Sequence, residues 1–468
     1  MTQTHTAPAA TTSQTPTKAP GVGLSLAALI IVASFVIPTL LDWEVYARKD
    51  PEAFGTIEPL HGFWDPNYFG PGTLPAVAIA LLALVYAVPL AQQLPWRWLL
   101  VTCYLAGLAW MLSLAFTDGI PGVEHVLANR HEYFETALEI DDVPQMLDEY
   151  IARIPYAHPD NWVVHLAGHP PGAVLFFIAL VRLGVTSPLW AGLITAALGA
   201  TVVVPVLMTM RTLGAETAAR AVAPFLALSP AGIFIAVSAD GLFAAVAAWG
   251  MAALAVAATS ATRGRMAGFA VVAGLLLGYT VMMSYGLPLL GVLAIAILIA
   301  ARGSWWPVPI AAVVALGVVL VFAALGFAWW EAYPVLAERY WDGLAQDRPF
   351  AYWGWGNLGA LLIAAGPMIG SGVALLAVNV PSRQRLAGTG ETVSNRRVVL
   401  LLAGAAVLMI LIADLSRMSK AEVERIWLPF MPWLTLSLAL LPQRWVRPAL
   451  AVQLGSALVV ETLLYTSW

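Results

Sequence analysis

The sequence predicts an all-α, polytopic helix bundle that is embedded in a membrane. Of its 468 residues, 60% are apolar and 11% are charged, whereas soluble domains average about 25% charged residues. The mean hydropathy is +0.80. The 19 tryptophans and 32 prolines also suit membrane helices, which place tryptophan at the interfaces and tolerate proline. This composition excludes a disordered chain, a secreted disulfide scaffold and, at a formal charge of −4, a nucleic-acid-binding protein.

Apolar runs of roughly 20 residues, the length that crosses a bilayer, recur along the whole chain. We expect a disordered cytoplasmic tail at residues 1–21, rich in Thr, Ala and Pro, followed by one transmembrane domain at residues 22–468. About thirteen transmembrane helices are expected in this domain. They cover residues 22–41, 73–91, 98–117, 188–210, 221–239, 241–260, 266–284, 287–301, 306–328, 355–379, 398–413, 427–441 and 448–465.

A further apolar run, Gly172–Val185, is too short to span and follows two prolines, so it predicts a half-inserted helix. This choice sets the orientation, because Lys and Arg accumulate in cytoplasmic loops. If the run does not cross, eleven of the later basic residues fall inside and five fall outside. The inner set is Arg211, Arg220, Arg263, Arg265, Arg302, Arg383, Arg385, Arg396, Arg397, Arg444 and Arg447; the outer set is Arg339, Arg348, Arg417, Lys420 and Arg425. The predicted outer loops are therefore 42–72, 118–187, 329–353 and 414–426.

The first long outer loop is unusual in composition. Residues 118–170 hold ten acidic residues against two basic ones, and five of the seven histidines of the chain. Solvation alone accounts for most of this charge, but loops of such length are uncommon without a function of their own. The segments Val123–Leu138 and Val143–Ile154 carry apolar residues at helical spacing, which predicts amphipathic helices on the outer leaflet.

Asp118 is the first candidate for chemistry. It directly follows an expected transmembrane helix, so it lies where water thins and a carboxylate can act as a general base. Gly119 allows the backbone to turn there. The alternative is an ordinary aspartate at a helix end.

The string His169-Pro170-Pro171-Gly172 is the most distinctive in the chain. Two prolines fix φ and favour a helix start, so the residues before them approach the membrane in an extended conformation. A helix start explains the prolines but does not require the histidine. His169 is therefore a candidate ligand at the mouth of the site.

Two arginines on the outer side, Arg348 and Arg425, are candidates for binding a phosphate. A guanidinium holds a phosphate through paired hydrogen bonds. The alternative is an ion pair with a nearby carboxylate such as Asp347, Glu422 or Glu424, which contributes little by itself at an exposed site. Glu422 and Glu424 are also candidates to support the site or to bind a metal.

Asp240 lies between two expected transmembrane helices, where an ionisable group needs water, a partner or a cavity. Together with Asp118 it suits Mg²⁺ or Mn²⁺, and the sequence leaves the dependence on a metal open. His165 and His169 have the i, i+4 spacing of a transition-metal site. Pro170 breaks the helix that such a site needs, which disfavours it.

These features, in this order, resemble the GT-C glycosyltransferases that use polyprenyl-phosphate sugars, over residues of about 100 to 435. They are Asp118-Gly119, the long outer loop, HPPG at 169–172, Asp240 and EVERIWLP at 422–429. Within that class, Arg339-Tyr340, Asp347-Arg348-Pro349 and EVERIWLPF are similar to actinobacterial transferases typified by mycobacterial methylthioxylose transferase. The HPP feature is shared with protein mannosyltransferases. Many GT-C enzymes carry the catalytic acid after their first span, which leaves Asp42 as a rival to Asp118.

The resemblance implies transfer of a sugar from a polyprenyl-phosphate donor to a cell-envelope glycan or lipoglycan acceptor, at the outer face of the plasma membrane. One such reaction moves methylthioxylose to the mannose caps of lipoarabinomannan. Asp118 would take the proton of the acceptor hydroxyl, and Arg425, with Arg348 or His169, would stabilise the leaving phosphate in an inverting displacement. The expected partners are the donor, the acceptor and membrane lipids.

Two other classes remain open. A membrane transporter or lipid flippase would show interrupted helices and charges near the bilayer midplane, whereas the charges of this chain cluster at the outer rim and no internal repeat is visible. A non-catalytic membrane scaffold would leave the clustered outer histidines, carboxylates and arginines unexplained.

Overall fold

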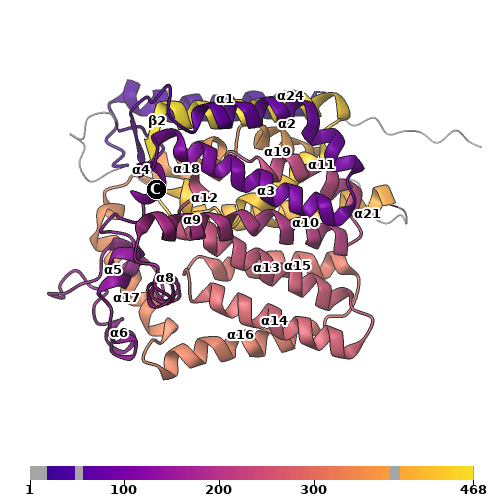
Figure 1. Ribbon diagram of the computed structural model, residues 1–468. Helices are drawn as coiled ribbons and strands as arrows, with labels where there is room; N and C mark the ends of the chain where they lie inside the picture. Colours follow the sequence, from indigo (N-terminus) through magenta and orange to yellow (C-terminus); the bar gives the residue numbers. More distant parts are fainter. Residues whose placement is uncertain (1–17, 48–55, 380–390, 467–468) are drawn as a thin grey trace, which may run out of the picture.

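Long α-helices that run side by side make up most of the computed structural model (Figure 1). The structure describes residues 18–47, 56–379 and 391–466. Within these ranges nine helices are long and apolar enough to cross a membrane, one of them interrupted by a short 3₁₀ turn. They are α1 (Ala19–Leu41), α2 (Thr73–Gln93), α3 (Trp96–Ala115), α9 with α10 (Pro188–Gly199 and Val203–Thr212), α13 (Ala239–Thr259), α14 (Arg263–Val281), α16 (Pro307–Ala324), α21 (Glu391–Leu415) and α24 (Gln443–Leu463).

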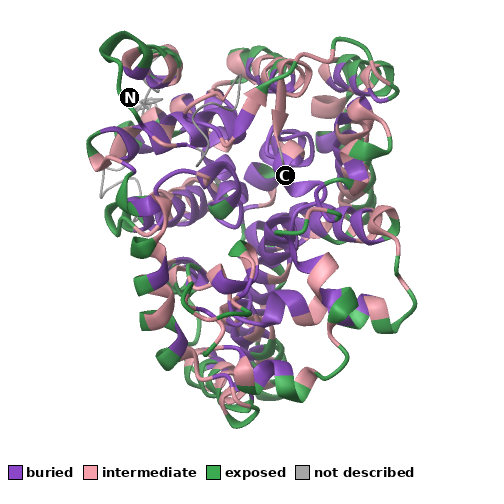
Figure 2. Ribbon diagram, turned by 90° about the vertical axis from the view of Figure 1, so that its left-hand side faces the viewer, coloured by how far each residue is buried: buried purple, intermediate pink, exposed green. Residues whose placement is uncertain are grey.

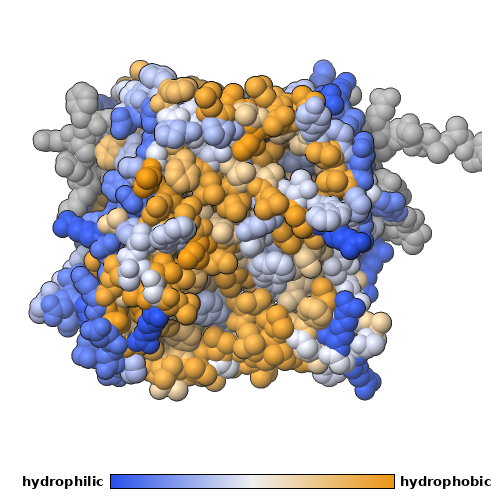
Figure 3. All heavy atoms as spheres, viewed as in Figure 1, coloured by the Kyte–Doolittle hydropathy of each residue, from blue (hydrophilic) through white to orange (hydrophobic). Residues whose placement is uncertain are grey.

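The outer surface of the bundle is apolar along the helices and polar at their two ends. Figure 3 shows hydrophobic residues across the middle of the molecule, between hydrophilic residues at the left and right. Large apolar side chains such as Leu29 and Val313 are 63% and 70% exposed. Such a band is stable only in contact with lipid. The prediction of an all-α bundle in a membrane is therefore confirmed at the level of class.

Three of the thirteen expected transmembrane helices are short or broken. The chain forms α11 (Glu216–Ala227) and α12 (Gly232–Ile235) over the run 221–239, and only η3 (Leu287–Leu289) with α15 (Leu290–Ala301) over 287–301. The run 427–441 divides into the end of α22 (Val423–Ile426), α23 (Met431–Thr435) and η5 (Leu436–Leu440). Prolines lie at the breaks of the first and third runs, Pro230 in one and Pro429 and Pro432 in the other, because each lacks an N–H donor and clashes with the preceding turn. The helices themselves do not confirm the count of thirteen.

A fourth expected helix, over residues 355–379, is sharply bent. Helices α18 (Phe350–Ala364) and α19 (Met368–Asn379) meet at 110° across Gly366-Pro367. Gly366 has φ +91°, a left-handed conformation that glycine adopts without strain. The side chain of Gln453 satisfies the freed backbone, since its Nε2 donates to Ala365 O at 2.8 Å and its Oε1 accepts from Met368 N at 3.2 Å.

The segments predicted to be outer loops gather at one end of the bundle, at the left of Figure 1. Helix α3 ends there and α9 begins there, so the segment between them returns to the same end. Helix α8 (Gly172–Arg182) lies across the direction of the long helices (Figure 1). Its first residue is in close contact with α14, because Gly172 N donates to Met282 O at 2.7 Å and a Cβ on Gly172 would lie 2.3 Å from that oxygen. Helix α8 therefore does not run along the bundle, and its half-inserted position in the membrane stays a prediction.

The surface helices of this segment are shorter than the sequence suggested, so both expected ranges are wrong. In place of Val123–Leu138 the chain forms α4 (Pro121–Glu124) and α5 (Tyr133–Glu139), and α6 covers only Val143–Glu149. Between α4 and α5 the side chain of Asn129 accepts a hydrogen bond from His131 N, a turn that competes with helix. Figure 2, which views this end, shows buried residues beneath the exposed ones.

Three further connections hold this end together. The strands β1 (Gly62–Trp64) and β2 (Leu464–Thr466) pair antiparallel and join the C-terminal part of the chain to the loop after α1. Helix α7 (Val164–Gly168) precedes the HPPG string, and Tyr150 Oη donates to Leu166 O. From α17 (Trp329–Asp342), Arg339 Nη2 donates to Trp162 O at 2.8 Å. Loops distant in sequence are thereby fixed to one another.

The arrangement predicts which ends of the helices face the cytoplasm. The α13–α14 turn lies at the end opposite α5 and α6 (Figure 1) and carries Arg263 and Arg265. An impermeant maleimide applied to intact cells of a Cys103→Ala background should label Asp141→Cys, and it should label Ala261→Cys only after the membrane is permeabilised. Labelling of Ala261→Cys alone in intact cells would reverse the predicted orientation.

Candidate functional site

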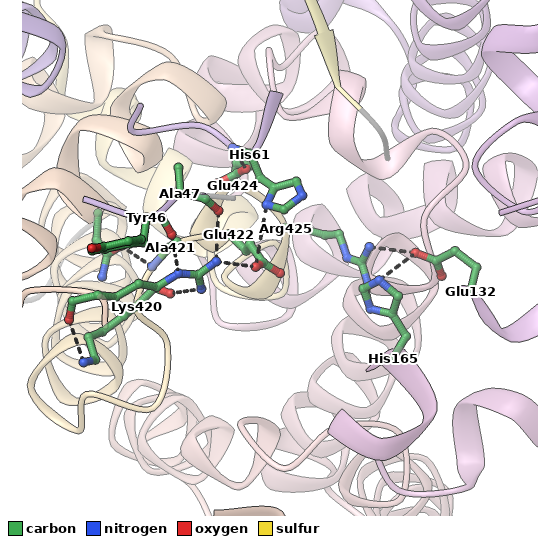
Figure 4. Close-up of polar contacts among 12 residues, drawn as sticks. Tyr46, Ala47, His61, Glu132, His165, Lys420, Ala421, Glu422, Glu424 and Arg425 are labelled. Carbon is green, nitrogen blue, oxygen red and sulfur yellow. Dashed lines mark hydrogen bonds and ion pairs between the residues drawn. The ribbon is translucent and has the colours of Figure 1, made fainter. Parts of the chain in front are cut away.

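A buried network of charged and polar side chains lies at the end of the bundle where the outer segments meet. Its members come from five separate parts of the chain, and most are shielded from solvent. Figure 4 shows how several of them face one another. The members are His61, Glu132, His165, His169, Asp240, Arg348, Glu422, Glu424 and Arg425.

Arg425 lies at the centre of one half of the network and uses all three of its guanidinium nitrogens. Nε donates to Asp240 Oδ2 at 2.6 Å, and Nη1 donates to Glu132 Oε1 at 2.8 Å. Nη2 lies 2.8 Å from Nδ1 of His165 (Figure 4). Arg425 is only 4% exposed. Burial opposes its charge, but Glu132 and Asp240 outweigh this effect and raise the pKa of Arg425 above its usual value.

His165 is neutral in this arrangement, with its proton on Nε2. An arginine can only donate, so Nδ1 of His165 must accept from Arg425. The remaining nitrogen, Nε2, then faces Glu132 Oε1 at 3.4 Å. Burial first, and then the charge of Arg425, hold the pKa of His165 well below its usual range. Arg425 and His165 thus bind one carboxylate oxygen between them.

His169 supports this half of the network through contacts with His165 and with two aromatic rings. It follows α7 in extended conformation (φ −135°, ψ 152°), and its Nδ1 lies 2.9 Å from His165 O. Its ring packs against Tyr133 and Phe243, with ring centroids 5.9 and 5.8 Å away. Burial lowers the pKa of His169. The HPPG string therefore positions His169 beside His165, which holds the backbone of α7 in place.

Arg348 is the centre of the other half. Its guanidinium donates to three backbone oxygens, those of Tyr46, Ala47 and Lys420, and to Glu422 Oε1 at 3.0 Å. Nδ1 of His61 lies 3.7 Å from the same Glu422 oxygen. Burial raises the pKa of Glu422, but His61 and Arg348 outweigh it and lower that pKa to about 2. Arg348, just before α18, thus joins the loop after α1 to the loop after α21.

The loop before α22 has an unusual backbone. Arg417, Ala421 and Glu422 all adopt left-handed conformations, with φ of 61°, 69° and 62°. Such residues cost roughly 1–3 kcal/mol each and persist where the surroundings over-determine them. Here the left-handed turn at Ala421 and Glu422 directs Glu422 toward Arg348 while Arg425, three residues on, faces Glu132.

Buried side chains supply the constraint that this loop needs. Asn357 of α18 donates to Asp414 Oδ1 at 2.8 Å and to Ser419 O at 3.0 Å, and it accepts from Ala421 N at 3.1 Å. Tyr340 Oη accepts from Lys420 N at 3.0 Å. The Arg339-Tyr340 string therefore serves to fix two loops of this end, Arg339 the outer segment and Tyr340 the strained loop.

Glu424 lies inside the network without a complete set of partners. Its side chain is fully buried, and Oε1 accepts from His61 N at 2.8 Å. Oε2 has no hydrogen-bond partner among the described residues. Burial is the main cause that raises the pKa of Glu424 to about 7. The carboxyl of Glu424 therefore binds a proton much more tightly than the carboxyl of Glu422, two residues earlier.

Asp118 lies outside the network. It ends the 3₁₀ turn η1 (Phe116–Asp118), and its Oδ1 accepts from Asn67 Nδ2 at 2.8 Å. With His125, Glu461 and Tyr465 it lines a cavity of about 40 Å³, enough for a few water molecules. The predicted site residues thus fall into two places, Asp118 in this cavity and the other six in the network.

The metal interpretation does not fit these positions. Asp118 is bound by Asn67 and Asp240 by Arg425, so the two carboxylates predicted to share Mg²⁺ or Mn²⁺ have separate partners. The described residues contain no group of three or more His, Cys, Asp or Glu placed to hold a metal. Asp42, the rival base, is exposed at the end of α1 and is part of neither place.

Sequence reasoning missed several residues of the network. Glu132 was one of ten acids in a loop, and His61 had no motif around it. Asn357 carried a usable signal, because a lone amide inside the apolar run of α18 is costly unless it is bonded. His165 was considered only with His169 as a metal ligand, whereas its actual partner is Arg425.

Comparison with known proteins identifies no relative. No protein-family model matches the chain, and no curated protein or solved structure matches it significantly.

The contacts of Arg425 predict its effect on stability. Arg425→Ala leaves Glu132 and Asp240 buried without their cation, so it should lower the free energy of unfolding by about 3–5 kcal/mol. Arg425→Lys should cost less, because it keeps the charge but loses the fork geometry. Thermal unfolding in detergent measures both. The exposed Arg265→Ala is the control, expected within about 0.5 kcal/mol of wild type; equal effects for Arg425→Ala and Arg265→Ala would contradict the assignment.

The raised pKa of Glu424 predicts a pH dependence. The folded state holds this proton more tightly than the unfolded state, so the stability contributed by Glu424 falls as pH rises from about 4.5 and levels off above about 7. Glu424→Gln removes this loss. The melting temperature of the variant relative to wild type should therefore rise between pH 5 and pH 8, whereas exposed Glu338→Gln should show no such trend. A flat difference for Glu424→Gln would mean that the carboxyl titrates normally.

Proposed function

We propose that this protein is a membrane glycosyltransferase of GT-C type, which transfers a sugar from a polyprenyl phosphate to a cell-envelope glycan or lipoglycan. In this proposal the chain crosses the plasma membrane thirteen times, with the short and bent helices completing the passages. The network and the Asp118 cavity face the extracytoplasmic side. The charge distribution supports this orientation, since basic residues collect at the opposite end.

The observation that carries the proposal is the anion position between Arg425 and His165. Glu132 Oε1 occupies it, 2.8 Å from Nη1 of Arg425 and 3.4 Å from Nε2 of His165. A phosphate oxygen has the same hydrogen-bonding needs as a carboxylate oxygen and more negative charge. The donor phosphate would therefore compete with Glu132 for Arg425. Glu132 lies in the segment between α3 and α9, so its displacement would open this segment when the donor binds.

The proposed reaction needs one base and one anion site. The cavity supplies the base, Asp118, and the buried network supplies the anion site at Arg425. Asp118 takes the proton of the acceptor hydroxyl, whose oxygen attacks the anomeric carbon as the bond to phosphate breaks. Arg425 stabilises the leaving phosphate, and Arg348 and His169 hold the surrounding loops. The cavity and the anion site share one short stretch of the chain: Ala236 and Val237 line the cavity, and Asp240 binds Arg425.

The bent pair α18–α19 is the sharpest break among the described helices and favours a transporter or flippase, in which broken helices line the substrate path. In such proteins the freed backbone binds ions or substrate. Here the side chain of Gln453 forms hydrogen bonds with the backbone groups freed at the break, Ala365 O and Met368 N. The charged groups are instead at the end of the bundle. This difference supports the enzyme over the transporter.

The experiment is to incubate the purified protein with a panel of polyprenyl-phosphate sugars and an envelope glycan, and to measure release of the lipid phosphate. Asp118→Asn should lower the rate at least about 100-fold, because it removes the base and keeps the shape. Asp65→Asn, an exposed carboxylate nearby, is the matched control and should stay near wild type. Activity of Asp118→Asn within about threefold of wild type would transfer the role to Asp42 or Asp240.

A further inference from the structure

Glu461 is a carboxyl group in a place where the sequence suggested only an apolar span. It lies near the end of α24, in the run Leu458-Val459-Val460-Glu461-Thr462-Leu463. An ionisable side chain in such a helix is costly and usually has a functional role. Its position gives the reason, because Glu461 lines the same cavity as Asp118.

The two carboxyls of this cavity have different surroundings. Asn67 donates to Asp118, and its amide is fixed by a second bond to Thr117 O at 3.1 Å. The described residues supply no hydrogen bond to the carboxyl of Glu461. Asp118 therefore has a fixed hydrogen-bond donor for its carboxyl group, and Glu461 has none among the described residues.

No cation offsets a second negative charge in the cavity. Neither lysine nor arginine occurs among its described lining residues, and α12 contributes only Ile233 and the next residues Ala236 and Val237. The one basic group is His125 after α4, whose Nδ1 lies 2.6 Å from Tyr465 Oη of β2. Asp65, on the loop that pairs with α24, is exposed and outside the cavity. Two ionised carboxylates in so small a space would repel one another.

We propose that Glu461 is the second functional carboxyl of the acceptor site and stays protonated beside the carboxylate of Asp118, which rests on the glycosyltransferase proposed above. In the resting state Glu461 holds the proton and Asp118 is the carboxylate. When Asp118 takes the proton of the acceptor hydroxyl, the electron pair stays on the acceptor oxygen and the proton of Glu461 stays in place. Glu461 is thus a positioning residue that leaves a single negative charge on the group that acts as base.

Dicyclohexylcarbodiimide tests this pairing without any assay of activity, because this apolar reagent modifies protonated carboxyl groups. In the full-length protein at pH 7, peptide mass spectrometry should find label on Glu461 and none on the peptide that carries exposed Asp141 and Asp142. Asp118→Asn removes the neighbouring negative charge, so Glu461 should ionise more readily and its labelling should fall by up to about threefold. Asp118→Glu and Asp65→Asn keep that charge and should label as wild type.

The outcomes separate this proposal from the one on which it rests. An unlabelled Glu461, or labelling that Asp118→Asn does not change in a protein that elutes as wild type, would overturn the pairing of a protonated Glu461 with an ionised Asp118. Labelling that depends on Asp118 in a protein that releases no lipid phosphate would leave the pair standing and refute the glycosyltransferase. If transfer is observed, Glu461→Gln should change the shape of its pH profile, because the amide cannot lose a proton, whereas a purely structural role would lower the rate equally at every pH.

Discussion

The end of the bundle that holds the charged network depends on one interaction, the pairing of Arg425 with Glu132 and Asp240. The three residues are 4%, 2% and 3% exposed, so none can exchange its partner for water without moving the backbone. Glu132 belongs to the outer segment, Asp240 begins α13, and Arg425 lies in α22. An ion triad of this kind adds little net stability over apolar packing, but losing one member is costly. The triad therefore specifies which segments meet, and the apolar bundle provides the stability.

The second half of the network shows what such specificity requires. Left-handed conformations at Arg417, Ala421 and Glu422 would not persist in an isolated loop. They persist because Asn357 and Arg348 satisfy the carbonyls and amide of this loop from inside the bundle. The strain is thus balanced by buried hydrogen bonds, and the loop holds Glu422 and Arg425 in opposite directions. Binding groups on a rigid loop lose little entropy when a ligand arrives.

The sequence predicted the helices well and their partners poorly, for physical reasons. Apolar runs of sufficient length report directly on membrane helices, so α1, α2 and α13 begin and end within three residues of expectation. Helix α16 begins as expected but ends earlier than the run 306–328 suggested. Proline positions explain the broken runs only once the neighbours that satisfy the freed backbone are known. The contact of Glu132 with Arg425 joins residues 293 positions apart, and no local pattern encodes it. Glu461 was overlooked because one carboxyl hardly alters the hydropathy of a span.

The segment from Phe234 to Gly241 links the two places where site residues lie. Ala236 and Val237 form part of the cavity wall beside Asp118, and Asp240, three residues on, binds Arg425. The turn between them is rigid, since Ser238 Oγ donates to Phe234 O at 2.6 Å and accepts from Gly241 N at 3.1 Å. Gly241 packs so closely that a Cβ would lie 2.4 Å from Ile235 O. The turn therefore keeps Asp118 and Arg425 at a fixed separation. The proposed displacement would require that constraint, because nucleophile and leaving group must stay aligned about one carbon.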